Sequence, residues 1–106
     1  MGVLSVGDDL PVWRGGGRII YSIIEYAIGT IGKRPYLTAL KTSFDHGYNH
    51  ADLELLTRDE LNEFRNAAAS YARNTQWKSE GFNDCEQLMQ ELLGLIDARL
   101  AQLTTH

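Results

Sequence analysis

Cysteine is the scarcest residue of this 106-residue chain, in which Cys85 supplies the single thiol. One cysteine excludes an internal disulfide and leaves too few thiolates for a cysteine-based zinc finger. The helical periodicity around Cys85 places it on the inner side of a helix. We therefore predict a buried, unreactive thiol, since a nucleophilic cysteine needs an activating base beside it.

Long hydrophobic runs are also missing. The longest apolar stretch, Ile19–Ile31, is interrupted by Glu25 and falls short of the roughly 20 residues that cross a bilayer. The first residues do not show the basic-then-apolar order of a signal peptide. We expect a cytoplasmic protein that has no membrane partner.

Motifs for catalysis and cofactor binding are absent as well. The glycine run in "WRGGGRII" (13–20) has no clear strand before it and no lysine–serine or lysine–threonine pair after it, so it is not a P-loop. We interpret this run as a hinge. The histidines have no nucleophile elbow to work with, and no basic recognition helix indicates a nucleic-acid partner. We expect a protein that is not an enzyme and that holds no cofactor or metal.

Charge is distributed unevenly along the chain, which has a formal net charge of −4. Residues 1–43 carry five basic and three acidic side chains, whereas residues 44–97 carry four basic and eleven acidic ones. An acidic surface of this kind repels nucleic acid and favours a basic protein partner. The alternative is that the acidic groups only keep the protein soluble.

The pattern of apolar residues predicts an all-α fold. We expect one domain over 1–106, built as a bundle of about four helices with an irregular N-terminal arm at 1–17, which proline and glycine interrupt. The first helix is predicted over 18–32, where apolar groups nearly surround the helix axis and a strand is the less favoured alternative. The second begins at Pro35 and stops at Gly47.

The helix over 57–74 carries the clearest local signals. Thr57 and Glu60 have the spacing of a capping box, in which each side chain accepts a hydrogen bond from the other residue's backbone N–H. The inner stripe of this helix is apolar and its outer face is acidic. A fourth helix follows from Asn83, with an apolar arc wide enough to contact two neighbours. We expect these side chains to form a partner-binding surface: Asp52, Glu54, Asp59, Glu60, Glu63 and Trp77.

Trp77 has two interpretations, because it stands between the third and fourth predicted helices. In the first, it caps the core from a loop together with Phe82. In the second, it is partly exposed beside the acids and acts as an interface anchor, a role in which tryptophan is enriched. Only the second places Trp77 on the binding surface.

The segment "SFDHGYNHAD" (43–52) concentrates Asp45, His46, His50 and Asp52. Two imidazoles and two carboxylates could ligate a metal or perform acid–base chemistry. Gly47, however, is expected to break the helix between the two histidines, so that they need not share a face. A polar connector is therefore the favoured interpretation, and this cluster is where an enzyme would have its site.

The segment "ADLELLTRDELNEFRNAAASYA" (51–72), followed by "WKSEGFNDCEQLMQELLGLIDARL" (77–100), resembles the small acidic helical immunity proteins that bacteria encode beside toxins, including those of contact-dependent growth inhibition. The resemblance lies in size, acidity and the style of helix entry. It implies a protein that binds a cognate toxin, often a nuclease, and blocks its activity. The five carboxylates of the predicted surface would then face a basic cleft of that toxin.

Two other classes of function stay open beside an immunity protein. One is a small structural or regulatory helical module, either a monomer or a homodimer that pairs through apolar surface. The other is a small enzyme or metal protein built around the histidine cluster of 45–52. Only the immunity hypothesis accounts for all three observations: the charge asymmetry, the single small domain and the absence of catalytic motifs.

Overall fold

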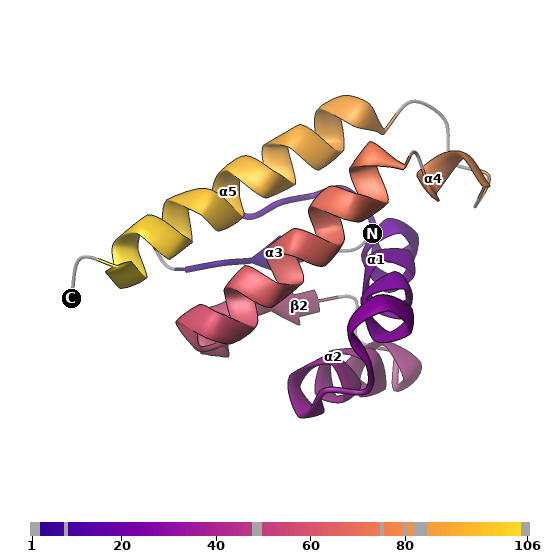
Figure 1. Cartoon of the computed structure of the whole chain (residues 1–106), viewed down its shortest axis with the longest axis horizontal. Helices are drawn as coiled ribbons and strands as arrows, with labels where there is room; N and C mark the ends of the chain where they lie inside the picture. Colours follow the sequence, from indigo (N-terminus) through magenta and orange to yellow (C-terminus); the bar gives the residue numbers. More distant parts are fainter. Residues whose placement is uncertain are drawn as a thin grey trace.

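Four long helices dominate the computed structural model, which describes residues 3–7, 9–47, 50–74, 76–79, 81 and 85–104 (Figure 1). The long helices are α1 (Gly17–Ile31), α2 (Pro35–Asp45), α3 (Arg58–Arg73) and α5 (Glu86–Thr104). Shorter elements join them: strands β1 (Val3–Ser5) and β2 (His50–Asp52), the 3-10 turn η1 (Leu53–Leu55) and the one-turn helix α4 (Gln76–Ser79). The predicted single domain of four main helices is confirmed.

Helix α3 forms where its capping signal predicts it. Thr57 Oγ1 accepts a hydrogen bond of 3.2 Å from the Glu60 N–H, and Glu60 Oε1 accepts one of 2.9 Å from the Thr57 N–H. Two N–H groups that would lack intrahelical partners are thereby satisfied. The predicted stripe is buried, with Leu61, Phe64 and Tyr71 at most 1% exposed.

Helix α1 confirms the helical interpretation of the isoleucine-rich segment. Its inner face is buried through Ile19, Ile20, Ile23, Ile24 and Ala27. The helix packs against both α2 and α3, which explains why so much of its circumference is apolar. Gly32 ends it with a backbone φ of 113°, a conformation that glycine adopts at no steric cost.

The N-terminal arm is more regular than the sequence predicts. Strand β1 pairs in parallel with β2, with Leu4 opposite Ala51, and on its other side Leu4 exchanges two backbone hydrogen bonds with Trp13 (2.9 and 2.8 Å). The prediction of an irregular arm is therefore wrong at 3–5. The connection expected before α3 likewise contains β2 as well as a turn of helix. Strands of three residues lack the length for a visible period-2 pattern.

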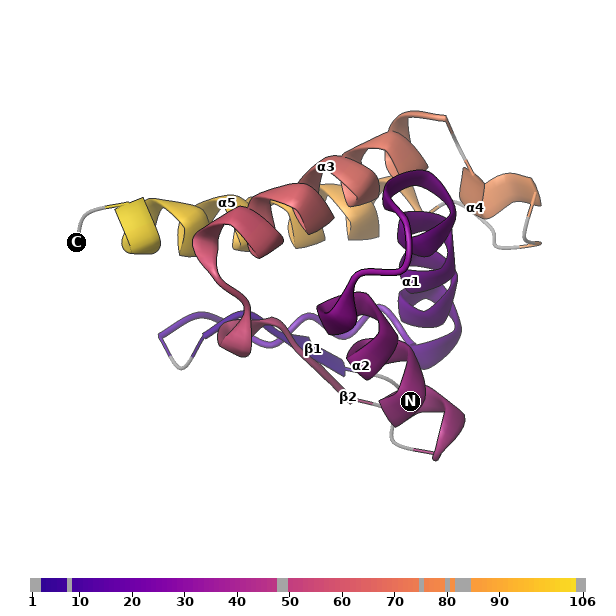
Figure 2. The ribbon, with the colours of Figure 1, turned by 60° about the horizontal axis from the view of Figure 1, so that its bottom comes forward.

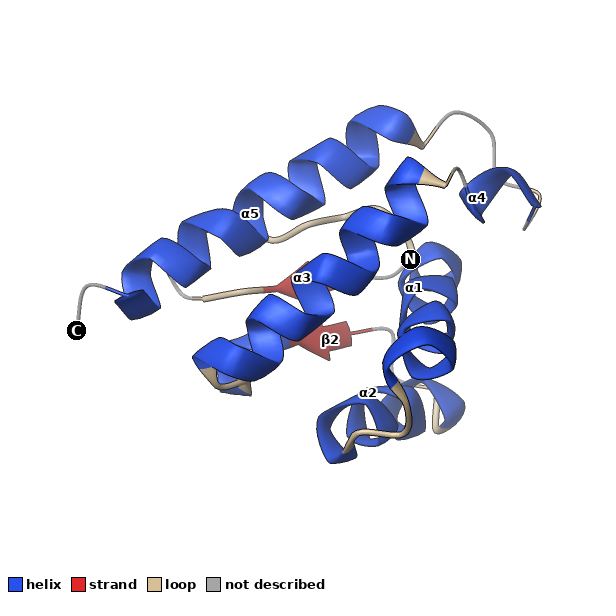
Figure 3. Ribbon diagram, viewed as in Figure 1, coloured by secondary structure: helices blue, strands red, loops and turns tan. Residues whose placement is uncertain are grey.

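The elements form two layers with a closed end. Helices α3 and α5 lie side by side and run in opposite directions, while the small sheet lies beneath them and α1 and α2 close one end (Figures 1 and 2). Figure 3 shows how little of the chain is strand. Arg65 bridges α3 to α5 by donating to both Asp97 carboxylate oxygens, at 3.0 and 3.3 Å.

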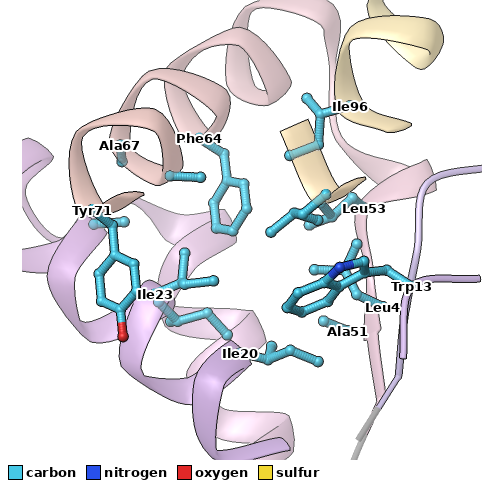
Figure 4. Packing of buried hydrophobic residues seen from close by; sticks show 14 of the residues in the cluster. Leu4, Trp13, Ile20, Ile23, Ala51, Leu53, Phe64, Ala67, Tyr71 and Ile96 are labelled. Carbon is cyan, nitrogen blue, oxygen red and sulfur yellow. The ribbon is translucent and has the colours of Figure 1, made fainter. Parts of the chain in front are cut away.

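One hydrophobic core lies between these layers. Phe64 of α3, Ile96 of α5 and Trp13 of the arm point into the same interior (Figure 4). The radius of gyration is 12.7 Å, which matches the ~13 Å of a single compact domain of about 100 residues. Among the described residues, no helix is long and apolar enough to cross a membrane.

A candidate protein-binding groove

A groove of about 410 Å³ lies where α2, β2, η1 and the start of α3 meet. Four elements that are separate in sequence supply its walls, and Figure 2 shows where α2 and β2 approach one another. Its described lining residues are Tyr36, Ala39, Leu40 and Ser43 of α2, His50 and Asp52 of β2, Leu55 of η1 with Leu56 directly after it, and Glu60 of α3. The groove therefore combines an apolar floor with polar and acidic side chains.

The short turn η1 determines which leucine is exposed beside the groove. Asp52 precedes the turn, and its Oδ1 accepts a hydrogen bond of 3.0 Å from the Glu54 N–H. The tight turn sends Leu53 (0% exposed) and Leu56 (8%) toward the core and leaves Leu55 83% exposed. A leucine that is held outward by a capped turn is an apolar contact point at the edge of the groove.

The charge of the groove is negative. Among its described lining residues, the charged side chains are Asp52 and Glu60, and none is lysine or arginine. Each carboxylate uses one oxygen in a cap, Asp52 for η1 and Glu60 for α3. Within the described chain, the second oxygen of each has no hydrogen-bond or ion-pair partner. Both groups can therefore accept hydrogen bonds from a bound cation.

His50 stands at the rim of the groove. Its side chain is exposed, and its Nε2 lies 3.0 Å from the Ser5 hydroxyl oxygen across the β1–β2 pair. This contact joins the His50 side chain to β1, and Asp52, which lies on β2 with His50, also lines the groove. The structure thus links His50 to the acidic groove and not to the other histidine of its sequence cluster.

The six predicted surface residues do not share one site. Asp52 and Glu60 line the groove, whereas Asp59 is exposed beside a separate hollow of about 170 Å³. Glu54 follows Asp52 in η1 and is half-buried, outside the described lining. The structure therefore brings two of the predicted carboxylates, Asp52 and Glu60, into one groove.

Glu63 has an intramolecular role that periodicity did not predict. Its carboxylate accepts hydrogen bonds from Arg34 (3.3 and 3.4 Å) and from the Tyr36 hydroxyl (2.7 Å). Burial of Tyr36, together with its hydrogen bond to the Glu63 carboxylate, raises the pKa of the Tyr36 phenol well above its ordinary value. Glu63 thus joins α2 to α3 through both of its carboxylate oxygens.

Trp77 belongs to the core. Its side chain is 5% exposed and lies in α4, next to the end of α3. The core-capping interpretation is confirmed for this residue, and the partly exposed anchor is wrong. Periodicity could not decide between the two, because α4 is a single turn. Phe82, its expected companion, and Asn83, the expected cap of the last helix, lie outside the described residues.

The histidine cluster is divided between the end of α2 and β2. Asp45 ends α2 and accepts a 3.2 Å hydrogen bond from the Tyr21 hydroxyl, while His46 is exposed at the cap of that helix. His50 and Asp52 lie on β2. In the described part of the chain, no group of three or more histidine, cysteine or carboxylate side chains could hold a metal ion. Cys85 is 3% exposed, as its periodicity predicts.

The apolar part of the groove was missed in the sequence. The run "LELL" directly before the Thr57 cap could have indicated it, since a tight turn through three leucines cannot bury all of them.

Comparisons of the chain with protein-family models, with curated protein sequences and with solved structures found no match. The groove itself is therefore the basis for inferring a function.

Proposed function

We propose that this protein is an immunity-type inhibitor that binds a basic protein toxin through the groove of α2, β2, η1 and α3 and blocks its activity. The single observation that carries the proposal is the composition of this groove. It joins an 83% exposed leucine to two carboxylates, Asp52 and Glu60, with no described lysine or arginine in its lining.

Both parts of the groove have a physical use in binding a protein. An exposed leucine beside a hollow can pack against an apolar side chain of a partner. This contact is favourable because it removes apolar surface from water. Carboxylates at its edge accept hydrogen bonds from lysine or arginine and discriminate against acidic surfaces. The net charge of −4 adds long-range attraction for a basic partner, which speeds encounter at low salt.

The resemblance of 51–100 to immunity proteins agrees with this use of the groove. The groove residues Asp52, Leu55, Leu56 and Glu60 all lie in the first ten residues of the resembling segment. In an immunity protein, such a surface would occupy the toxin's active site or the surface that binds its substrate. A homodimeric interaction module is the second candidate, favoured by a separate groove on α5 that is described below.

The test uses two charge-matched pairs of substitutions. Asp52→Asn with Glu60→Gln removes both groove charges, and it keeps both caps because asparagine and glutamine retain the accepting oxygen. Glu54→Gln with Asp59→Asn makes the same change in net charge outside the groove. Each tagged protein is used to capture partners from a lysate of the organism that encodes it, at moderate salt.

We expect the wild type and the Glu54/Asp59 pair to retain one basic protein that the Asp52/Glu60 pair loses. Expressed in a test strain, this protein should stop growth, and co-expression of the wild type should restore it. Equal capture by both pairs would remove the groove from the proposal. A captured protein whose activity is unaffected by the wild type would contradict inhibition.

A further inference from the structure

A second groove, of about 460 Å³, lies between the N-terminal arm and α5. Its described lining residues are Pro11, Val12, Trp13 and Arg14 of the arm and Leu88, Glu91, Gly94 and Leu95 of α5. Val12 is 40% exposed and is, with Leu55, one of the two large hydrophobic side chains exposed in the described chain. This arm–α5 groove shares no described lining residue with the first groove.

Helix α5 has more apolar surface than its own chain covers. Its wide apolar arc predicts two neighbours, yet α3 is the one helix against which it packs extensively. The arm covers part of the rest, where the Trp13 indole donates a 2.8 Å hydrogen bond to the Leu88 carbonyl. Leu88 and Leu95 nevertheless stay half-buried in the groove. Part of the apolar surface of α5 is therefore left uncovered at this groove.

Gly94 leaves space for another backbone to approach. It is exposed in the middle of α5, and a Cβ atom added there would meet nothing within 4 Å. Glycine in a helix interior is less favourable than alanine. Gly94 therefore leaves a flat point on the exposed surface of α5, inside the lining of the arm–α5 groove.

The charges of this groove complement each other. Arg14 and Glu91 both line it and both are exposed, and neither has an ion-pair partner among the described residues. In a two-fold symmetric pair, a surface meets its own copy, so that each contact between two different residues of the surface occurs twice, once in each direction. A groove that carries one cation and one anion is suited to that symmetry.

We propose that two copies of this chain pair through the arm–α5 groove, with Arg14 of one copy beside Glu91 of the other. Val12, Leu88 and Leu95 then bury their remaining apolar surface, and Gly94 allows the two α5 helices to come close. The first groove stays open in each copy. The pair therefore presents two partner-binding sites, and its formation does not depend on the proposed inhibition.

Sedimentation equilibrium of the purified full chain tests this proposal. The wild type should show twice the monomer mass of 11.9 kDa at high concentration and dissociate on dilution. Arg14→Glu and Glu91→Arg should each weaken self-association about tenfold or more, because like charges then meet at both contacts. An equimolar mixture of the two variants should restore the dimer, since each mixed pair again joins opposite charges.

A pair of glycine substitutions supplies the matched control. Gly94→Arg should give a folded monomer, because a Cβ atom at this exposed position meets nothing within 4 Å in one chain, whereas the long side chain blocks a second helix. Gly29→Arg, at an exposed and equally open glycine of α1, should stay dimeric. A wild type that is monomeric at every concentration would overturn the proposal. So would single charge variants that dimerise as the wild type does, or a mixture that fails to restore pairing.

Discussion

The Tyr36 hydroxyl donates a hydrogen bond of 2.7 Å to the Glu63 carboxylate and so joins α2 to α3. Arg34 reaches the same carboxylate from the start of α2, at 3.3 and 3.4 Å. Tyr36 also forms part of the wall of the first groove. The contact therefore fixes the position of one groove wall relative to the α3 end that supplies Glu60.

This contact predicts a loss of stability at alkaline pH. Burial and the hydrogen bond to Glu63 raise the pKa of Tyr36 in the folded state above its unfolded value of about 10. Above that pH the unfolded chain loses the phenolic proton while the folded chain keeps it, so the free energy of unfolding falls as pH rises. Tyr36→Phe removes this contribution.

Urea unfolding measured from about pH 9 to pH 11 checks the effect. The stability of the wild type should fall more steeply with pH than that of Tyr36→Phe over this range. The variant should be less stable at neutral pH, because it lacks the hydrogen bond to Glu63. Parallel curves for the two proteins would show that Tyr36 titrates alike in the folded and unfolded states.

The two leucines of η1 should differ sharply in their contribution to stability. Leu53 is fully buried, so Leu53→Ala should lower the free energy of unfolding by about 2–5 kcal/mol. Leu55 is 83% exposed, so Leu55→Ala should change it by no more than about 0.5 kcal/mol. Chemical denaturation of the two variants measures both effects. Equal losses would mean that η1 does not hold Leu55 outward.

The elements predicted from sequence are those whose signals are local. Thr57 and Glu60 stand three residues apart, and Gly32 and Gly47 end their helices directly, so each pattern is complete within a few residues. The contacts that were missed join distant parts of the chain. β1 pairs with β2 although the paired residues, such as Val3 and His50, are 47 positions apart, and the partners of Glu63 lie 27 and 29 residues before it.

The candidate groove shows the same division between local and non-local signals. Asp52 and Glu60 were expected on a partner-binding surface from their charge, which can be read from the sequence. Which acids share a groove depends on how β2, η1 and α3 pack, and that packing is decided by non-local burial. Trp77 illustrates the limit, because one turn of helix is too short for a period to indicate which side is buried.

The glycine beside Trp13 is predicted to be intolerant of substitution. A Cβ atom at Gly15 would overlap the Trp13 indole ring, which is itself 2% exposed and hydrogen-bonded to the Leu88 carbonyl. Gly15→Ala should therefore displace the indole and destabilise the protein by about 1–3 kcal/mol. Gly29→Ala, where the space is open, should instead stabilise α1 by up to about 1 kcal/mol.

Thermal unfolding of the two alanine variants measures this contrast, and tryptophan fluorescence reports whether the indole has moved. A Gly15→Ala variant as stable as the wild type would mean that the arm moves aside without loss. The docking of the arm on α5 would then contribute little to the fold.

The most direct measurement is the dissociation constant of the captured partner for the two charge-matched pairs, determined by titration calorimetry at one salt concentration. Removing the charges of Asp52 and Glu60 should weaken binding about tenfold or more, equivalent to about 1.4 kcal/mol. Removing those of Glu54 and Asp59 should change it much less, although net charge changes equally. Equal weakening by both pairs would show that overall acidity, and not the groove, holds the partner.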